Sequence, residues 1–433
     1  MKRGFYLIMA AQFFSSLADN ALLIASIALL AQLDGPAWMT PLLKFFFTIS
    51  YVILAPFVGA FADARPKGQV MFITNTIKVF GCIAMLYNDV LDVEWLQPHT
   101  IVLASYAFVG LGAAAYSPAK YGILTELLPA EQLVAANGWI EGLTVCSIII
   151  GTVIGGGLIS PRVSDALLSM DIPRFESGIN SPAEAAIPVI VGFYVLAAIF
   201  NLFIPDTGAR YEHQPRNPIT LVRDFGHCFK TLWSDKLGQI SLGVTTLFWG
   251  AGATLQFIVL AWALQHLGLQ LDRGAILQGV TALGIALGAV LAARYVPLKR
   301  SLSVLSVGVG MGLVVITMVF VSYMPLVYAL LIVIGAMAGF FVVPMNALLQ
   351  HRGHVLLSAG HSIAVQNFNE NISILIMLAL YSLLVKENVP VHYIIVAFGL
   401  FVSTSMLMVM RLHRANQRKG DSLHLIGMEK PHA

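Results

Sequence analysis

Long apolar stretches recur along the whole chain, from Phe5 to His413. A helix crosses the hydrocarbon core of a bilayer with about 20 apolar residues, and these stretches reach that length. Only 11% of the 433 residues are charged, whereas soluble domains carry roughly 25%. The sequence therefore predicts an all-α integral membrane protein with no room for a sizeable soluble domain.

Gly, Pro and charged residues divide the apolar sequence into twelve expected membrane-spanning helices. These spans lie near residues 5–31, 41–62, 69–88, 99–123, 132–160, 186–205, 239–266, 274–296, 301–322, 325–349, 358–385 and 390–413. The longest polar connection follows the sixth span. The expected organisation is an N-terminal six-helix half at 1–205, a cytoplasmic linker at 206–238, a C-terminal six-helix half at 239–414 and a cytoplasmic tail at 415–433.

Lys and Arg are divided unevenly between the two sides of the expected spans. Of the 25 such residues, 19 lie on the side of the termini, and the opposite loops hold four, namely Arg162, Arg174, Arg273 and Lys386. Because loops rich in Lys and Arg stay in the cytoplasm, we expect both termini there. The net charge of +3 then reflects topology and does not indicate nucleic-acid binding.

The linker contains a second kind of pattern. Apolar residues recur at three- and four-residue steps from Leu221 to Trp233, while Arg216, Arg223 and Lys230 repeat every seven residues. This pattern predicts an amphipathic helix on the inner membrane surface. It would act either as a linker between the halves or as a docking site for a partner or anionic lipid.

Ionisable residues inside membrane spans are costly and usually functional. Asp19, Glu141 and Glu370 lie roughly 15–22 Å from the cytoplasmic starts of their helices at about 1.5 Å per residue, near the expected midplane. They predict a polar cavity, and nearby amides and a lysine complete the candidate binding residues: Asp19, Asn20, Lys120, Glu141, Asn346, Asn367 and Glu370. The alternatives to a binding role are that Glu141 simply forms hydrogen bonds to neighbouring helices and that Lys120 is the cation partner of Asp63. Lys78 is expected to snorkel or to pair internally.

The sequence offers no set of catalytic or metal-binding residues. It has no G-x-x-x-x-G-K-[ST] loop, no G-x-S-x-G elbow and no H-x-x-x-x-D pair. Its three cysteines lack C-x-x-C spacing, and His351 and His354 form only an isolated H-x-x-H. We therefore expect no enzyme activity, no cofactor and no metal.

The loop after the second span reads GAFADARPKG, from Gly59 to Gly68. It resembles the G-x-L-A-D-R-x-G-R-R loop of the major facilitator superfamily. That resemblance implies a gate, in which Gly59 allows close helix approach and Asp63 accepts from a facing helix N-terminus and a nearby cation, with Lys67 as the basic residue of the motif. The alternative is an ordinary solvated turn.

At finer grain the chain resembles the bacterial lysophospholipid transporter family of that superfamily. The matching stretches include DNALL (19–23), VGLGAAAYSPAKYGIL (109–124), GFFVVPMNALLQ (339–350) and AVQN (364–367). The resemblance implies a twelve-helix major facilitator fold that carries lysophospholipids, especially lysophosphatidylethanolamine, from the outer to the inner leaflet of the bacterial inner membrane. A separate acyltransferase/acyl-carrier-protein synthetase would re-acylate them there.

Two departures from the related patterns affect mechanism. Ala107 stands where the superfamily's proton-coupling arginine would be, and Gln256 stands where the family often carries a basic residue. We therefore expect Lys120 and the asparagines to meet the phosphate, and the three midplane carboxylates to meet the ethanolamine ammonium. The alternatives are a proton-coupled exporter of drugs or amphiphilic molecules, and a membrane scaffold for the re-acylation enzyme that docks it on the linker helix.

Overall fold

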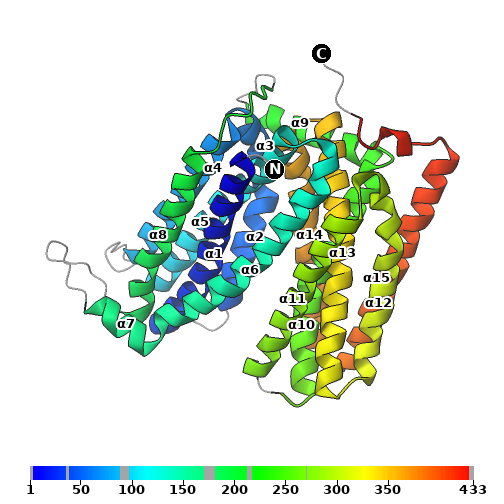
Figure 1. Cartoon of the computed structure of the whole chain (residues 1–433). Coiled ribbons are helices and arrows are strands. Elements are labelled where there is room, and N and C mark those ends of the chain that lie inside the picture. Colours follow the sequence, from blue (N-terminus) through cyan, green and yellow to red (C-terminus); the bar gives the residue numbers. More distant parts are fainter. Residues whose placement is uncertain are drawn as a thin grey trace. The chain divides into compact units, whose positions relative to one another are not determined.

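The computed structural model of the chain describes residues 3–35, 39–87, 97–169, 181–211, 217–269 and 271–428. Within these ranges it contains helices and turns but no strand (Figure 1). Among the described residues, eleven helices are long and apolar enough to cross a membrane, and the number is twelve if one bent pair counts as a single span. The protein is therefore a multi-pass membrane protein. Arg174, Arg216 and the last tail residues, 429–433, lie outside the described residues.

The chain divides into two compact units. One unit comprises residues 1–123 and 146–216, and the other comprises residues 124–145 and 217–433. The unit boundary falls within two helices, α5 and α6, so the first half of α6 belongs to the second unit. The two-half organisation with a separate linker stays a prediction.

The first unit is a bundle of apolar helices. Its helices are α1 (Arg3–Gln32), α2 (Met39–Ile53), α3 (Ala55–Asp63), α4 (Lys67–Leu86), most of α5 (Pro98–Leu127), the second half of α6 (Leu133–Ile159), α7 (Pro161–Leu168) and α8 (Pro182–Leu202). Helix α8 packs against both α1 and α4. Its start is fixed by Ser181 and Glu184, which cap each other's backbone N–H groups. This packing sets the depth at which polar side chains of three helices meet.

The second expected span is bent in the structure. Helices α2 and α3 meet at 64° after a break at Leu54. Pro56 lies in the first turn of α3, where its missing N–H and its ring prevent the preceding helix from continuing through it. The short helix α7 is a further difference, since no helix was expected between the fifth and sixth spans.

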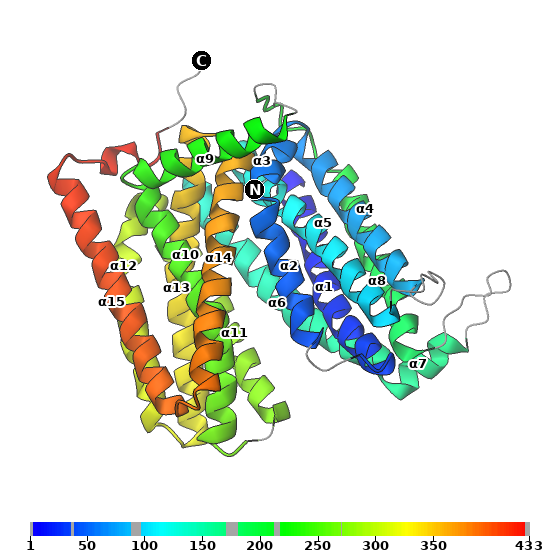
Figure 2. The same ribbon diagram turned by 180° about the vertical axis from the view of Figure 1, so that it is seen from behind.

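The second unit contains the remaining long helices. They are α10 (Gly238–Gln265), α11 (Leu271–Tyr295), α12 (Leu305–Ile316), α13 (Met324–Leu356), α14 (Ala359–Lys386) and α15 (Val391–Arg418). Short 3₁₀ segments, Leu298–Val304 and Thr317–Phe320, flank α12. The closest helix pairs are α11 with α13, α10 with α14 and α12 with α15 (Figure 2), around one buried apolar core.

Glycines bring α11 and α13 into direct backbone contact. A Cβ atom on Gly284 or Gly288 of α11 would overlap the backbone of Ile332 or Ala336 in α13. A Cβ on Gly339 of α13 would overlap the Ile285 carbonyl in return. Small residues four apart are the usual means of close helix packing in membranes. The glycine pairs therefore fix the separation of these two helices.

The linker forms a helix, α9 (Pro218–Ser234), as its pattern predicts. Asn217 caps its start, and Pro218 occupies the first turn, where no N–H bond is lost. Helix α9 runs across the ends of α10, α13 and α14 (Figure 1). Its Phe225 and Phe229 rings pack against Phe368 of α14. Part of its apolar face is thus covered by protein, and the proposed contact of the helix with the membrane surface remains a prediction.

Candidate functional site

A buried ion pair lies at the junction of α1, α4 and α8. The Lys78 ammonium donates to both carboxylate oxygens of Asp19, at 2.8 and 2.9 Å. The Tyr194 hydroxyl donates to Asp19 Oδ1 at 2.6 Å. The Lys78 side chain is 1% exposed and the Asp19 side chain 22%. The expectation that Lys78 pairs internally is confirmed, and Asp19 already holds a cation supplied by the protein.

Further groups surround this pair. Lys78 also donates to Ser15 Oγ at 3.1 Å, and Ser15 in turn donates to Asn75 Oδ1 at 2.8 Å. The ammonium lies 5.3 Å from the ring centroid of Tyr116, a distance typical of cation–π attraction. These contacts compensate the burial of the lysine charge.

A second polar cluster lies in the other unit, where α6 meets α13 and α14. Asn346 Nδ2 donates to Glu141 Oε1 at 3.5 Å. Gln366 Nε2 donates to Asn346 Oδ1 at 3.2 Å and to Glu370 Oε1 at 2.7 Å. All four side chains are buried. The structure therefore brings three predicted site residues together through a residue that was not among them. We call these four residues the carboxamide cluster.

One turn away, α6 and α13 exchange a pair of amide hydrogen bonds. Asn137 Nδ2 donates to Gln350 Oε1 at 2.8 Å, and Gln350 Nε2 donates to Asn137 Oδ1 at 2.9 Å. Residues 137 and 141 are four apart on α6, and residues 346 and 350 are four apart on α13. Residues at this spacing share one helix face. Two antiparallel helices thus meet along a polar seam.

The other predicted binding residues have contacts within their own units. Asn20 Nδ2 donates to the Ser16 carbonyl of its own helix. Lys120 lies in the first unit, with its ammonium 4.0 Å from the Tyr121 ring centroid. The backbone carbonyl of Asn367 accepts from the Asn371 amide. Asp19, Asn20 and Lys120 belong to the first unit, and the other four candidates belong to the second.

The predicted gate residues lie at the junction of α3 and α4. Lys67 Nζ donates to Asp63 Oδ1 at 2.6 Å and to the Ala62 carbonyl at 2.8 Å. Both side chains of the ion pair are buried, and Gly59 is buried in α3. The Lys67 ammonium also lies 4.7 Å from the Tyr211 ring centroid. Because this ion pair is buried, the loop is not an ordinary solvated turn. The gating role itself remains a prediction.

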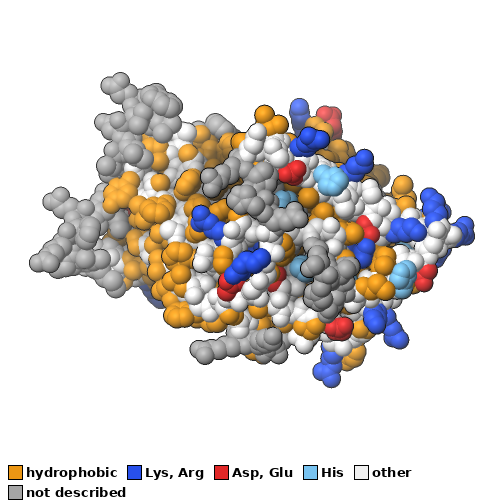
Figure 3. Space-filling model, turned by 90° about the horizontal axis from the view of Figure 1, so that it is seen from above, with side chains coloured by type: hydrophobic (Ala, Val, Ile, Leu, Met, Phe, Trp, Pro, Cys, Tyr) orange, Lys and Arg blue, Asp and Glu red, His pale blue; other side chains and the backbone are white. Residues whose placement is uncertain are grey.

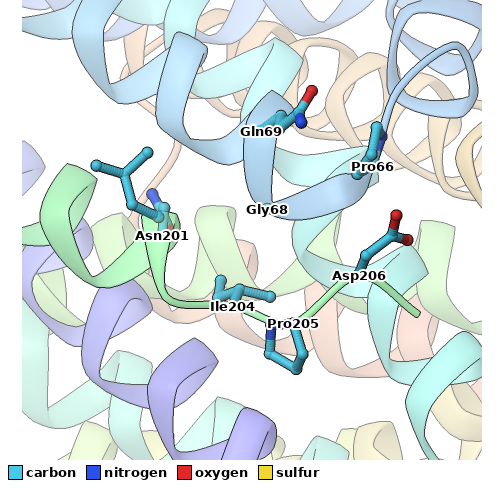
Figure 4. Close-up of a pocket in the computed structure, with 8 residues that line it drawn as sticks. Pro66, Gly68, Gln69, Asn201, Ile204, Pro205 and Asp206 are labelled. Carbon is cyan, nitrogen blue, oxygen red and sulfur yellow. The ribbon is translucent and has the colours of Figure 1, made fainter. Parts of the chain in front are cut away.

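A small cavity of about 220 Å³ lies beside this loop (Figure 4). It is lined by Pro66, Gly68, Gln69, Asn201, Leu202, Ile204, Pro205 and Asp206. Ligand pockets usually measure roughly 300–1,000 Å³, so this cavity suits a few waters better than a lipid head group. Hydrogen bonds from Arg210 lower the pKa of the exposed Asp206 carboxyl to about 2, so this pair keeps both charges at any physiological pH.

An ion pair that sequence reasoning missed joins α13 to the end of α9. Arg352 donates to both carboxylate oxygens of Asp235, at 2.6 and 3.2 Å. Asp235 also accepts from the Gly238 backbone N–H at 2.8 Å, at the start of α10. The pair is largely buried, although both residues lie outside the expected membrane spans. It ties three helices of the second unit together.

The residues of the H-x-x-H sequence have other contacts. His351 Nε2 accepts a hydrogen bond from the Gly427 backbone N–H at 3.0 Å, so this ring nitrogen holds the C-terminal tail. Within the part of the chain that the structure describes, no three His, Cys, Asp or Glu side chains gather as a metal site.

The sequence relationships of the chain agree with this architecture. A family model described as Major Facilitator Superfamily matches residues 8–378, and the fold is that of major facilitator transporters. Lysophospholipid transporter LplT of Yersinia pestis (strain Pestoides F) is 41% identical over 393 residues, which cover 90% of this chain and 89% of the relative. The same values hold for LplT of Yersinia pseudotuberculosis serotype O:3 (strain YPIII). The chain belongs to the lysophospholipid transporter family of the major facilitator superfamily.

Solved structures share the fold at much lower identity. A bacterial homologue of the iron transporter ferroportin, in an outward-facing state, has a TM-score of 0.71 and 15% identity, over 95% of this chain and 100% of that one. The transporter FucP, in the outward conformation, has a TM-score of 0.70 and 14% identity, over 95% and 98% of the two chains. These likenesses concern architecture alone.

Proposed function

We propose that this protein transports lysophospholipids across a membrane. The observation that carries the proposal is the 41% identity to LplT proteins over 90% of the chain. The buried polar clusters support it, because such groups are costly within apolar helices and usually mark a substrate path. The protein acts as a carrier and not as an enzyme.

The energetics of the substrate explain why a carrier of this kind is needed. A lysophospholipid has one acyl chain, which gains about 0.8 kcal/mol per buried CH₂, so the chain can remain in apolar surroundings throughout. The charged head group faces the cost of crossing hydrocarbon. A path lined with carboxylates and amides lowers that cost. In this proposal alternating access moves the head group, and the acyl chain stays in an apolar cleft.

The proposed direction is from the outer to the inner leaflet of a bacterial inner membrane, with both termini in the cytoplasm. The Lys and Arg bias of the sequence supports this orientation. Figure 3 looks onto the end of the molecule where α9 lies and shows Lys and Arg side chains at many positions. A separate acyltransferase/acyl-carrier-protein synthetase is the proposed consumer of the transported lipid.

The proposed substrate contacts follow the sequence candidates. Glu141 and Glu370 meet the ethanolamine ammonium, joined by Asp19 when it exchanges Lys78 for the substrate. Lys120 and the amides Asn20, Asn346 and Asn367 meet the phosphate. Asp63 and Lys67, with Gly59, hold the cytoplasmic gate.

Uptake of radiolabelled lysophosphatidylethanolamine into bacterial spheroplasts tests this function. Spheroplasts that lack their own transporter are compared with and without this chain. Uptake and re-acylation that require the chain support the proposal. No uptake, together with chain-dependent export of amphiphilic dyes that stops when the proton gradient is collapsed, would instead favour the exporter that superfamily membership also allows.

A further inference from the structure

Exposed cations gather where α12 begins and α15 ends. Arg411, Arg414 and Arg418 occupy the last turns of α15, and all three side chains are exposed. The 3₁₀ segment before α12 adds two more exposed cations, Lys299 and Arg300. Figure 3 shows Lys and Arg side chains along the margin of the molecule on the side of these helices.

Contacts between α12 and α15 bring the two groups of cations to one end of the helix pair. A Cβ on Gly312 would lie 2.6 Å from the Gly399 carbonyl, and a Cβ on Gly308 would lie 3.0 Å from the end of the Met406 side chain. The two helices are therefore antiparallel, and the start of α12 lies beside the end of α15. We call five residues the basic edge: Lys299, Arg300, Arg411, Arg414 and Arg418.

The arginine-bearing face of α15 is apolar further along the helix. Leu400 and Leu407 are 50% and 44% exposed, and Arg411 and Arg418 follow them at steps of four and seven residues. This spacing keeps all four side chains on one helix face. Exposed apolar side chains of a membrane-spanning helix contact lipid. Arg411 lies roughly 6 Å beyond Leu407 at about 1.5 Å per residue, so the basic edge begins where this lipid-facing surface approaches the head groups.

No carboxylate of the described residues neutralises the basic edge. Its five side chains form no ion pair within the described ranges. Neither α15 nor the segment Leu298–Val304 contains Asp or Glu. Asp421, three residues after Arg418, accepts a hydrogen bond from the Leu423 backbone N–H at 2.9 Å. The buried cations Lys78 and Arg352, in contrast, are both paired with carboxylates.

We propose that the basic edge binds an anionic phospholipid with two acyl chains, whose phosphate meets the arginines and whose acyl chains lie along the exposed leucines of α15. A guanidinium donates two parallel hydrogen bonds to phosphate oxygens. A soluble acidic protein would meet the charges but not the leucines, which lie at the depth of the hydrocarbon. In the proposed orientation this lipid belongs to the cytoplasmic leaflet. The inference does not depend on which molecule the protein transports.

Native mass spectrometry of the purified full-length protein measures this binding. Phosphatidylglycerol and phosphatidylcholine with the same two acyl chains are titrated separately, so that only the head group differs. Neither lipid is a lysophospholipid, so binding is distinguished from occupation by the proposed substrate. We expect the wild-type protein to bind phosphatidylglycerol at least about ten-fold more tightly, since each cation near an anionic head group contributes about five-fold in affinity.

Paired substitutions locate the site. Arg411→Gln with Arg414→Gln should weaken phosphatidylglycerol binding about 25-fold and change phosphatidylcholine binding less than about two-fold. Arg411→Lys with Arg414→Lys keeps both charges and should keep most of the preference. The matched control, Arg223→Gln with Lys230→Gln, removes two exposed cations from α9 and should leave both affinities unchanged. Thermal unfolding in detergent checks that each variant is folded.

Several results would overturn the inference. Equal affinity of the wild-type protein for the two lipids would leave the basic edge as a determinant of topology alone. Equal weakening by the α15 and α9 variants would show that binding follows net charge and not this edge. Binding of soluble polyglutamate to the arginines, without a preference for phosphatidylglycerol, would make an acidic protein the occupant instead. Should the double glutamine variant fail to fold, Arg411→Gln alone and the wild-type comparison decide.

Discussion

At the scale of single residues, two ion pairs of similar length differ in surroundings. Lys78 and Asp19 are 2.8 Å apart with the lysine fully buried, whereas Arg210 and Asp206 are 2.9 Å apart and exposed. Removing one partner of a buried pair leaves an uncompensated charge and costs about 3–5 kcal/mol. Exposed pairs contribute about 0–1 kcal/mol. Burial, and not distance, should therefore decide the effect of substitution.

Lys78→Met should lower the free energy of unfolding by roughly 3 kcal/mol, because Asp19 loses its cation inside the bundle. The double variant Asp19→Asn with Lys78→Met should recover most of this loss, since neither charge remains. Thermal unfolding of the protein in detergent measures both effects. Arg210→Gln is the matched control and should leave the midpoint almost unchanged. A double variant no more stable than Lys78→Met would contradict the account.

The carboxylates of the carboxamide cluster should be needed for transport. Glu370→Gln keeps the side-chain shape and removes the charge proposed to meet the ammonium, so we expect uptake to fall at least about ten-fold, as for a charged hydrogen bond. Glu131→Gln, which alters an exposed carboxylate, should leave uptake unchanged. Uptake into spheroplasts, normalised to the amount of folded protein, makes the comparison. Equal uptake by both variants would remove Glu370 from the proposed site.

The residue-scale candidates were found in the sequence, but their partners were not. Asp19, Lys78, Glu141 and Glu370 stood out because charge is rare within apolar spans. Asp19 and Lys78 are 59 residues apart, so their contact depends on how α1, α4 and α8 pack. Gln366 was visible only as a polar residue one turn before Glu370. Gln366 links Asn346 to Glu370 by hydrogen bonds. That link depends on how α13 and α14 pack, which the sequence does not show.

At the scale of elements, the separation of α11 and α13 depends on glycine. Gly288→Ala should lower the free energy of unfolding by about 1–3 kcal/mol, because the new methyl group overlaps the Ala336 backbone. Gly279 lies on the same helix with no atom within 4 Å of its expected Cβ. Gly279→Ala should therefore be neutral or stabilise by about 0.5–1 kcal/mol. Equal thermal shifts in the two variants would contradict this packing.

The anchoring of α9 depends on Arg352. Arg352→Gln removes the guanidinium that pairs with Asp235. It should lower the free energy that stabilises the junction of α9, α10 and α13 by roughly 3 kcal/mol. Hydrogen exchange of the α9 amides should then be at least about ten-fold faster. Arg210→Gln again serves as the control, because its partner lies on an exposed loop. Unchanged hydrogen exchange in Arg352→Gln would show that the aromatic contacts to Phe368 are sufficient to anchor α9 without the ion pair.

Element positions followed well from hydropathy, because membrane-spanning helices must be long and apolar. Each expected span corresponds to a helix or a helix pair in the structure. The bend before Pro56 was missed because the apolar sequence continues across it. Helix α9 was expected from its periodicity, but the sequence could not distinguish a face that contacts lipid from one that contacts α14. That distinction requires the packing of Phe225 and Phe229 on Phe368.

At the scale of the whole molecule, a major facilitator fold is combined with a lipid substrate. Two of the buried polar groups, the Asp19–Lys78 pair and the carboxamide cluster, lie within helices that are otherwise largely apolar. Such a protein needs to solvate only the head group during transport, since the acyl chain gains from apolar surroundings. Because Ala107 replaces the superfamily's proton-coupling arginine, we expect transport to be independent of a proton gradient.

The most direct test is to reconstitute the purified protein into liposomes and follow the accessibility of fluorescent lysophosphatidylethanolamine in each leaflet, with and without an imposed proton gradient. We expect protein-dependent movement of the lipid between leaflets at the same rate in both conditions. Movement only with the gradient would keep the substrate but make Asp19 or Glu370 a proton carrier. No protein-dependent movement in either condition would contradict the proposed function.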